Sequence, residues 1–228
     1  MLAYKGSPVL NDGIKLAVFD MDGVLVDSHS SWVLVHRHFG TDNEDSLQAF
    51  LRGEIDDMEF IRRDVERWTR AKGPVSLDEV VGVLDEAPLF PGAVETLRLL
   101  CDRGVRTAIV SGGLRYLAER IGSLANVDFV HANDVEVDGA GRLTGVGVVH
   151  VPLREKGSVV ARIQARTGIG PEATAVVGDT PVDVTMFRNA RVSIAFNPRD
   201  DITERSATHV VRSRDLRSVL PLLLHEDG

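Results

Sequence analysis

The chain has 228 residues, of which 43% are hydrophobic and 26% are charged, and its formal net charge at pH 7 is -8. Because this length exceeds a typical domain of roughly 100–150 residues, we expect one large domain or a core that carries an insert. The negative charge argues against a nucleic-acid or anionic-membrane partner, and the single cysteine, Cys101, excludes an intrachain disulfide.

The sequence gives no sign of a membrane segment. Residues 1–12 lack the apolar stretch of a secretory signal. No apolar run approaches the roughly 20 residues that a membrane span requires. We therefore expect a cytoplasmic protein without a membrane partner.

The first predicted strand, residues 16–19, ends on a pair of carboxylates. Asp20 and Asp22 follow it with Met21 between them. Residues i and i+2 share a face of an extended chain, so the two acids point the same way. Gly23 then permits a turn. One interpretation is a strand followed by an Asp-Gly turn; the other is a reactive acid pair, since open α/β sheets place their chemistry at strand carboxyl ends.

Residues 27–88 have helical rather than strand patterns. The two sets of residues with the i, i+4, i+7 spacing of an amphipathic helix are Trp32, His36 and Phe39, and Ile61, Val65 and Trp68. We predict that residues 27–88 form a small helical domain, inserted into a core made of residues 1–26 and 89–228. Both tryptophans are then expected in the interior of the insert.

The remainder of the chain alternates between strand-like and helical patterns. The further predicted strands are residues 107–110, 174–177, 192–196 and 208–211, with helical patterns at 93–100 and 157–166. Most of these runs are apolar throughout, as strands of a parallel sheet covered on both faces are. The alternation predicts an α/β fold with a doubly wound, Rossmann-like parallel sheet. Strand-type residues on both sides of Asp138-Gly139 add a β-hairpin.

Two further segments could contact an anion. Ser111 and Gly112 lie between a predicted strand and a helix, where a hydroxyl and backbone N–H groups can hold a phosphate. The alternative is that Ser111 caps the helix. Lys156 precedes another helix and is either a cation for a phosphate or an ordinary surface lysine.

A second pair of acids follows the predicted strand 174–177. Asp179 ends that strand and Asp183 lies four residues further on. Mg²⁺ prefers oxygen ligands and usually takes one or two carboxylates together with water and substrate phosphate. Asp179 and one acid of the first strand would meet that requirement. A simple turn between strand and helix is the alternative.

In this order, the four segments resemble the motifs of the haloacid dehalogenase superfamily of phosphohydrolases. They are DxDGV from Asp20, a strand ending in Ser-Gly-Gly, Lys156, and GDxxxD from Gly178, and the match runs from about residue 15 to 214. The helical insert resembles the C1 cap of that superfamily. The Ser-Gly-Gly segment, the hairpin and the residues after the fourth motif are most similar to its phosphoserine phosphatase branch.

The resemblance implies a mechanism. Rate gains for phosphate monoester hydrolysis reach ~10²¹, whereas general acid–base help supplies only ~10²–10⁴. Asp20 is implied to be the nucleophile that forms an aspartyl-phosphate. Asp22 is implied to be the general acid–base, and its like-charged neighbour favours its protonated form.

The resemblance also implies the remaining roles at the site. The ligands implied for Mg²⁺ are Asp20, the backbone carbonyl of Met21, and Asp179. Asp183 is implied to orient Lys156 or a metal-bound water. The residues implied to bind the phosphoryl oxygens are Ser111, Gly112 and Lys156.

The departures from the family pattern fall on substrate-selecting or loop positions. His29 stands where the phosphoserine phosphatases carry a cap glutamate, and it either contacts the substrate or packs in the insert. Arg62 and Arg63 lie near the position of the family's cap arginine, but the best ungapped match is Asp64. The fourth motif has residues 180–182 as Thr-Pro-Val in place of the usual GDGxND pattern.

We therefore expect a Mg²⁺-dependent phosphomonoester hydrolase for a small, phosphoserine-like metabolite, with His29, Arg62 and Arg63 as candidate substrate contacts. A sugar- or polyol-phosphate phosphatase is the alternative. A phosphotransferase or mutase would need a cap that excludes water. A non-catalytic binding protein would be expected to lack Asp20 or Asp22, and a dehalogenase usually lacks the second of these. The sequence indicates neither the exact substrate nor the oligomeric state.

Overall fold

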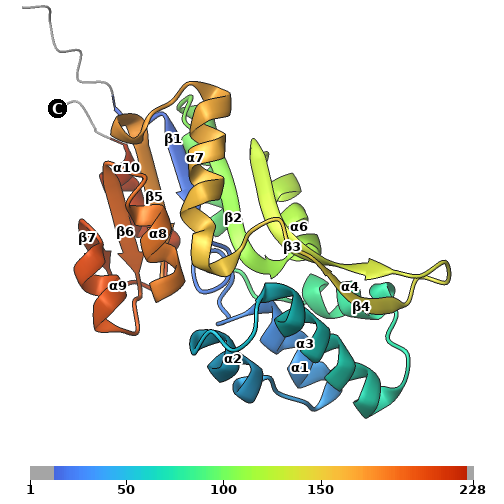
Figure 1. The fold of residues 1–228 in the computed structure, drawn as a ribbon. Coiled ribbons are helices and arrows are strands. Elements are labelled where there is room, and N and C mark those ends of the chain that lie inside the picture. Colours follow the sequence, from blue (N-terminus) through green and yellow to red (C-terminus); the bar gives the residue numbers. More distant parts are fainter. Residues whose placement is uncertain (1–12, 225–228) are drawn as a thin grey trace, which may run out of the picture.

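A seven-stranded sheet with helices on both faces forms the centre of the computed structural model, which describes residues 13–224 (Figure 1). The strand order is β4-β3-β2-β1-β5-β6-β7, and all neighbours are parallel except β3 and β4. The strands are β1 Leu16–Phe19, β2 Arg106–Leu114, β3 Phe129–Val137, β4 Leu143–Val148, β5 Thr174–Gly178, β6 Val192–Phe196 and β7 His209–Val211. This confirms the predicted α/β, doubly wound fold.

The helices divide into a group beside the sheet and a group beyond its carboxyl-terminal edge (Figure 1). Those of the first group are α5 Ala93–Asp102, α6 Arg115–Ala125, α7 Lys156–Thr167, α8 Val184–Phe187, α9 Asp201–Ser206 and α10 Leu220–Leu223. Those of the second are α1 Ser31–Phe39, α2 Glu44–Leu51, α3 Asp57–Lys72 and α4 Leu77–Asp85. Within residues 13–224, no helix is both long and apolar enough to cross a membrane. The prediction about residues 1–12 lies outside the described residues.

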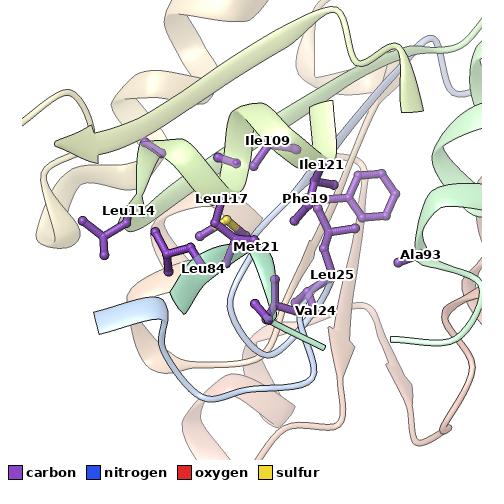
Figure 2. Close-up of a cluster of buried hydrophobic side chains, with 14 of the residues drawn as sticks. Phe19, Met21, Val24, Leu25, Leu84, Ala93, Ile109, Leu114, Leu117 and Ile121 are labelled. Carbon is purple, nitrogen blue, oxygen red and sulfur yellow. The ribbon is translucent and has the colours of Figure 1, made fainter. Parts of the chain in front are cut away.

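Apolar clusters on both faces explain why the strands are apolar throughout. Phe19 of β1 faces a cluster that includes Leu97 of α5 and Leu117 of α6 (Figure 2). Val18, its neighbour, faces the opposite cluster, where it packs with Val159 of α7 and other residues. Successive residues of a strand point to opposite faces, so both must be apolar when both faces are covered.

The predicted strand bounds agree with the structure for β1 and β6. The strand predicted to end at Val110 continues as β2 through the two glycines to Leu114. The first half of β3 was missed, since no strand was predicted beside β2, yet Phe129 to His131 pair with it in parallel. The predicted hairpin is confirmed, because β3 and β4 are antiparallel around the turn at Asp138.

We call residues 27–88 the helical segment. The two stretches of chain that enter and leave it run side by side. The amide of Asp27 donates to the carbonyl of Pro88 at 2.8 Å, and the amide of Phe90 donates to the carbonyl of Leu25 at 2.9 Å. The sequence patterns predict helices at the positions of α1 and α3 but do not distinguish α2 and α4. The hairpin also packs against this segment: a Cβ on Gly147 would lie 2.8 Å from Cδ1 of Ile61.

Candidate active site

Asp20 and Asp22 lie on the same side of the chain where it leaves β1. Met21 between them points into the apolar cluster below the sheet edge (Figure 2), so the two carboxylates face away from it. Both are buried, at 5% and 9% exposure. The chain then turns at Gly23, where φ is +78°. The carbonyl of Met21 accepts the amides of the next turn, among them that of Leu25 at 2.8 Å. The prediction that this carbonyl binds the metal is therefore wrong.

Lys156 is buried between two carboxylates and is not a surface lysine. Its side chain is 1% exposed, and Nζ lies 3.0 Å from Oδ1 of Asp20 and 2.6 Å from Oδ1 of Asp183. Burial alone would lower the pKa of Lys156, but attraction by Asp183 and Asp20 outweighs it and the pKa is raised. The ammonium therefore stays charged and fixes the position of the Asp20 carboxylate.

Asp183 organises the loop after β5. Its Oδ2 accepts the amides of Asp179 and Thr180, each at 3.0 Å, while its Oδ1 holds Lys156. Both oxygens are thus already paired. Oδ1 of Asp179 is buried and has no hydrogen-bond partner in the described chain. The carboxylate of Asp179 is therefore the one in this loop that is available to another group.

The acids form a cluster suited to a divalent cation. Ligand atoms of Asp20, Asp179 and Asp183 all lie within 4.8 Å of one another. Burial, with the charge of Asp183, raises the pKa of Asp179 well above its usual value, and burial also raises that of Asp20 against the attraction of Lys156. Buried carboxylates of this kind favour a bound cation, and oxygen donors suit Mg²⁺ or a similar hard ion.

Ser31 holds Asp22 and was missed in the sequence analysis. Its Oγ donates to Oδ2 of Asp22 at 2.9 Å and accepts the amide of Leu114 at 2.9 Å. The side chain of the preceding residue, Ser30, caps α1, so the serine pair carries a local signal for a helix start but none for a contact with Asp22.

Burial is the main reason that Asp22 favours its protonated form. It raises the pKa of this carboxyl to about 6, against the hydrogen bonds from Ser31. The like charge of Asp20, to which the sequence argument attributed the effect, is not among the causes for Asp22. Its Oδ1 has no hydrogen-bond partner within residues 13–224. A carboxyl of this kind can release and regain a proton near neutral pH.

The Ser-Gly-Gly segment lies in β2 beside the acid pair. Oγ of Ser111 accepts the amide of Gly113 at 3.1 Å. It does not cap α6, because that helix begins after Leu114 without a side-chain cap. A Cβ on Gly113 would lie 2.5 Å from Oδ2 of Asp22, so only glycine fits there. Nε1 of Trp32 donates to the carbonyl of Gly112 at 3.0 Å and ties α1 to this segment.

A cavity of about 430 Å³ joins these groups to the helical segment. The predicted residues that line it are Asp20, Asp22, His29, Ser111, Gly112, Lys156 and Asp179. His29 is exposed, and its Nε2 contacts Nη1 of Arg199. Among the residues predicted to act on the phosphoryl group or the metal through their side chains, only Asp183 does not line the cavity, and it contacts Lys156 instead.

Arg62 and Arg63 are not brought to the cavity, contrary to the prediction. Both pair with Glu59 on the outer face of α3. Asp64 lines the cavity instead. The sequence held a signal for this, because Asp64 falls in the same helical stripe as Ile61, at i+3.

The chain is similar to proteins of known family. A model of haloacid dehalogenase-like hydrolases matches residues 14–191. A phosphoserine phosphatase of Archaeoglobus fulgidus is 34% identical over 190 residues, which are 82% of this chain and 53% of that protein. One of Idiomarina loihiensis is 31% identical over 211 residues, which are 91% and 93% of the two chains. The chain thus spans about half the length of the first relative and nearly all of the second.

Solved structures of phosphoserine phosphatases have the same fold. A phospho-aspartyl intermediate analogue of such an enzyme has a TM-score of 0.79 and 28% identity, over 93% of this chain and 100% of that one. A substrate-bound phosphoserine phosphatase complex also has a TM-score of 0.79, over 92% of this chain and 99% of that one.

Proposed function

The chain belongs to the haloacid dehalogenase-like hydrolases, and we propose that it is a Mg²⁺-dependent phosphatase that hydrolyses phosphate monoesters through an aspartyl-phosphate on Asp20. One observation carries this proposal. A buried carboxylate at the end of the central strand is held by a buried lysine, beside a second carboxylate with an unpaired oxygen, Asp179. This arrangement supplies a nucleophile, a cation for the phosphoryl group and a metal site in one cavity.

The proposed reaction has two steps. In the first, an oxygen of Asp20 forms a bond to phosphorus, the bond to the leaving alkoxide breaks, and Asp22 donates its proton to that alkoxide. In the second, Asp22 takes a proton from water as the water oxygen attacks phosphorus and the bond to Asp20 breaks. The pKa of about 6 at Asp22 supports both roles. Ser31 orients this carboxyl through Oδ2 and leaves Oδ1 for the proton transfer.

Asp20 and Asp179 are the residues that would hold Mg²⁺ directly. A bound Mg²⁺ would neutralise the charge shared by the nucleophile and the phosphoryl group. Lys156, Ser111 and the backbone at Gly112 would hold the phosphoryl oxygens, as the family resemblance implies. Asp183 would keep Lys156 in place, which its 2.6 Å contact supports.

We propose that the substrate is a small, phosphoserine-like metabolite and that the helical segment, residues 27–88, is a cap domain over a core of residues 1–26 and 89–228. The names of the phosphoserine phosphatase relatives support the substrate class. The cavity between sheet edge and helices supports the cap. Because small phosphorylated metabolites are made and used inside cells, we propose a cytoplasmic location.

Phosphate release tests the proposal. The protein is assayed with p-nitrophenyl phosphate, phosphoserine, and sugar and polyol phosphates, with Mg²⁺ and with EDTA. Asp20→Asn is expected to remove turnover, and EDTA to suppress it. Asp27→Asn is the matched control, since it makes the same chemical change at an exposed position outside the cavity. Turnover by the Asp20→Asn protein equal to that of the control would refute the assignment of the nucleophile.

A further inference from the structure

The cavity has two unlike ends. Its sheet end holds the acids, Lys156 and Ser111, which account for a phosphoryl group. Its other wall belongs to the helical segment, and the alcohol part of an ester held at the sheet end would face that wall. The apolar residues on that wall are Trp32 and Val33 of α1, Leu47, Phe50 and Leu51 of α2, and Phe60 and Ile61 of α3.

The charged groups on the helical wall are carboxylates. Asp64 is buried, at 2% exposure, and its Oδ2 accepts Nδ2 of Asn43 at 3.0 Å. Its Oδ1 lies 3.3 Å from Nε2 of His36, yet neither atom has a hydrogen-bond partner in the part of the chain described. Asp57 is half-buried and also lines the cavity, and burial raises its pKa.

No lysine or arginine lines that wall within the described residues, and burial lowers the pKa of its histidine, His29. Lys156 is the only lysine or arginine among the described residues that line the cavity, and it is held by Asp20 and Asp183. Arg62, Arg63 and Arg67 of α3 pair with other carboxylates outside it. Arg199 contacts His29 but is not among the residues that line the cavity.

These charges favour one kind of leaving group. A carboxylate on the substrate would be buried beside Asp64 and Asp57 with no lysine or arginine in the lining of that wall to pair with it, which is costly. An ammonium would gain the negative charges of Asp64 and Asp57 and the aromatic faces that line the wall. We propose that the leaving alcohol carries an amine and no carboxylate, so that the substrate is an amino-alcohol monophosphate. This inference rests on the proposed phosphatase function and narrows its substrate class.

Four esters form a matched set for the test. Phosphoethanolamine has the amine alone, phosphoserine adds a carboxylate, phosphoglycolate has the carboxylate alone, and ethyl phosphate has neither. We expect kcat/KM for phosphoethanolamine to exceed that for each of the other three by at least about tenfold, the effect of one charge-assisted contact. A value for phosphoserine equal to or above that for phosphoethanolamine overturns the inference, and so does turnover of sugar phosphates alone.

Substitution of Asp64 provides a second measurement. Asp64→Asn is expected to lower the ratio of kcat/KM for phosphoethanolamine to that for ethyl phosphate by about tenfold. Glu66→Gln is the matched control, because it neutralises a carboxylate on the outer face of the same helix. An unchanged ratio in folded Asp64→Asn protein overturns the inference. If this variant does not fold, the profile of the unmodified enzyme still decides.

Failure of the inference and failure of the proposed function give different results. If the protein cleaves p-nitrophenyl phosphate or phosphoserine but does not prefer phosphoethanolamine, only the inference about the leaving group is wrong. If it cleaves no ester with Mg²⁺ present, the proposed phosphatase function is wrong as well.

Discussion

Gly23 is the position where a single added methyl group should test the geometry of the site. Its φ of +78° is unfavourable for any residue with a Cβ, and a Cβ there would lie 2.1 Å from Oδ2 and 2.6 Å from Cγ of Asp179. Asp179 is 3% exposed, so its carboxylate has little space to move away. Gly23→Ala should therefore displace a residue that we propose as a metal ligand.

Two costs contribute to the expected loss of stability. The left-handed backbone costs about 1–2 kcal/mol for a residue other than glycine. Overpacking against Asp179 adds about 1–3 kcal/mol. Together they predict a loss of about 2–5 kcal/mol, which is roughly 4–20 °C in Tm for a chain of this size. A shift of Asp179 by about 1 Å should also lower the rate by about 10²-fold.

Gly168→Ala separates the two costs. Gly168 has φ +69°, but nothing lies within 4 Å of its Cβ position, so only the backbone cost applies. Thermal unfolding of both variants in EDTA, and phosphatase rates over a range of Mg²⁺ concentrations, measure the effects. We expect the Gly168→Ala protein to keep its metal dependence and the Gly23→Ala protein to need more Mg²⁺. If the two variants have equal Tm and equal metal dependence, the close packing of Gly23 against Asp179 does not fix the position of the Asp179 carboxylate.

Three other substitutions test the charges at the site. Lys156→Met should abolish turnover and cost about 3–5 kcal/mol in urea unfolding, because it leaves Asp20 and Asp183 buried without their cation; unchanged stability would contradict this. Asp22→Asn should raise stability at pH 7.5 in EDTA by up to about 3 kcal/mol, since burial raises the pKa of this carboxyl from 3.8 to about 6 and penalises its charged form. That gain should vanish near pH 4, where the unmodified protein also has the group protonated. Ser31→Ala should lower kcat more than it raises KM and cost about 1–3 kcal/mol, through the unpaired groups it leaves; an equal change in both kinetic constants would argue against a positioning role.

Local patterns were sufficient for strand β1 and for the two acids that follow it. The run from Leu16 to Phe19 is apolar throughout because both faces of β1 are covered, and its bounds follow from that pattern alone. Asp20 and Asp22 share a side because the residue between them, Met21, belongs to the core. These features depend on neighbours in the sequence, so the sequence predicts them.

Long-range packing decided the features that were missed. The strand β3 joins β2 through residues such as Phe129, whose pairing partner is Ala108. Ser31 reaches Asp22 only because α1 packs back over the sheet edge. Neither of these contacts leaves a mark in the local sequence.

The sequence by itself determined the α/β fold class, the acids that follow β1 and β5, and the helical character of residues 27–88, because each of these depends on residue type and periodicity. Only the tertiary structure decided which side chains of the helical segment reach the cavity. Arg62, Arg63 and Asp64 are consecutive, and the rotation of α3 about its axis turns one inward and two outward. Packing of the buried stripe that includes Trp68 sets that rotation, so the charge that meets the leaving group is a property of the folded chain.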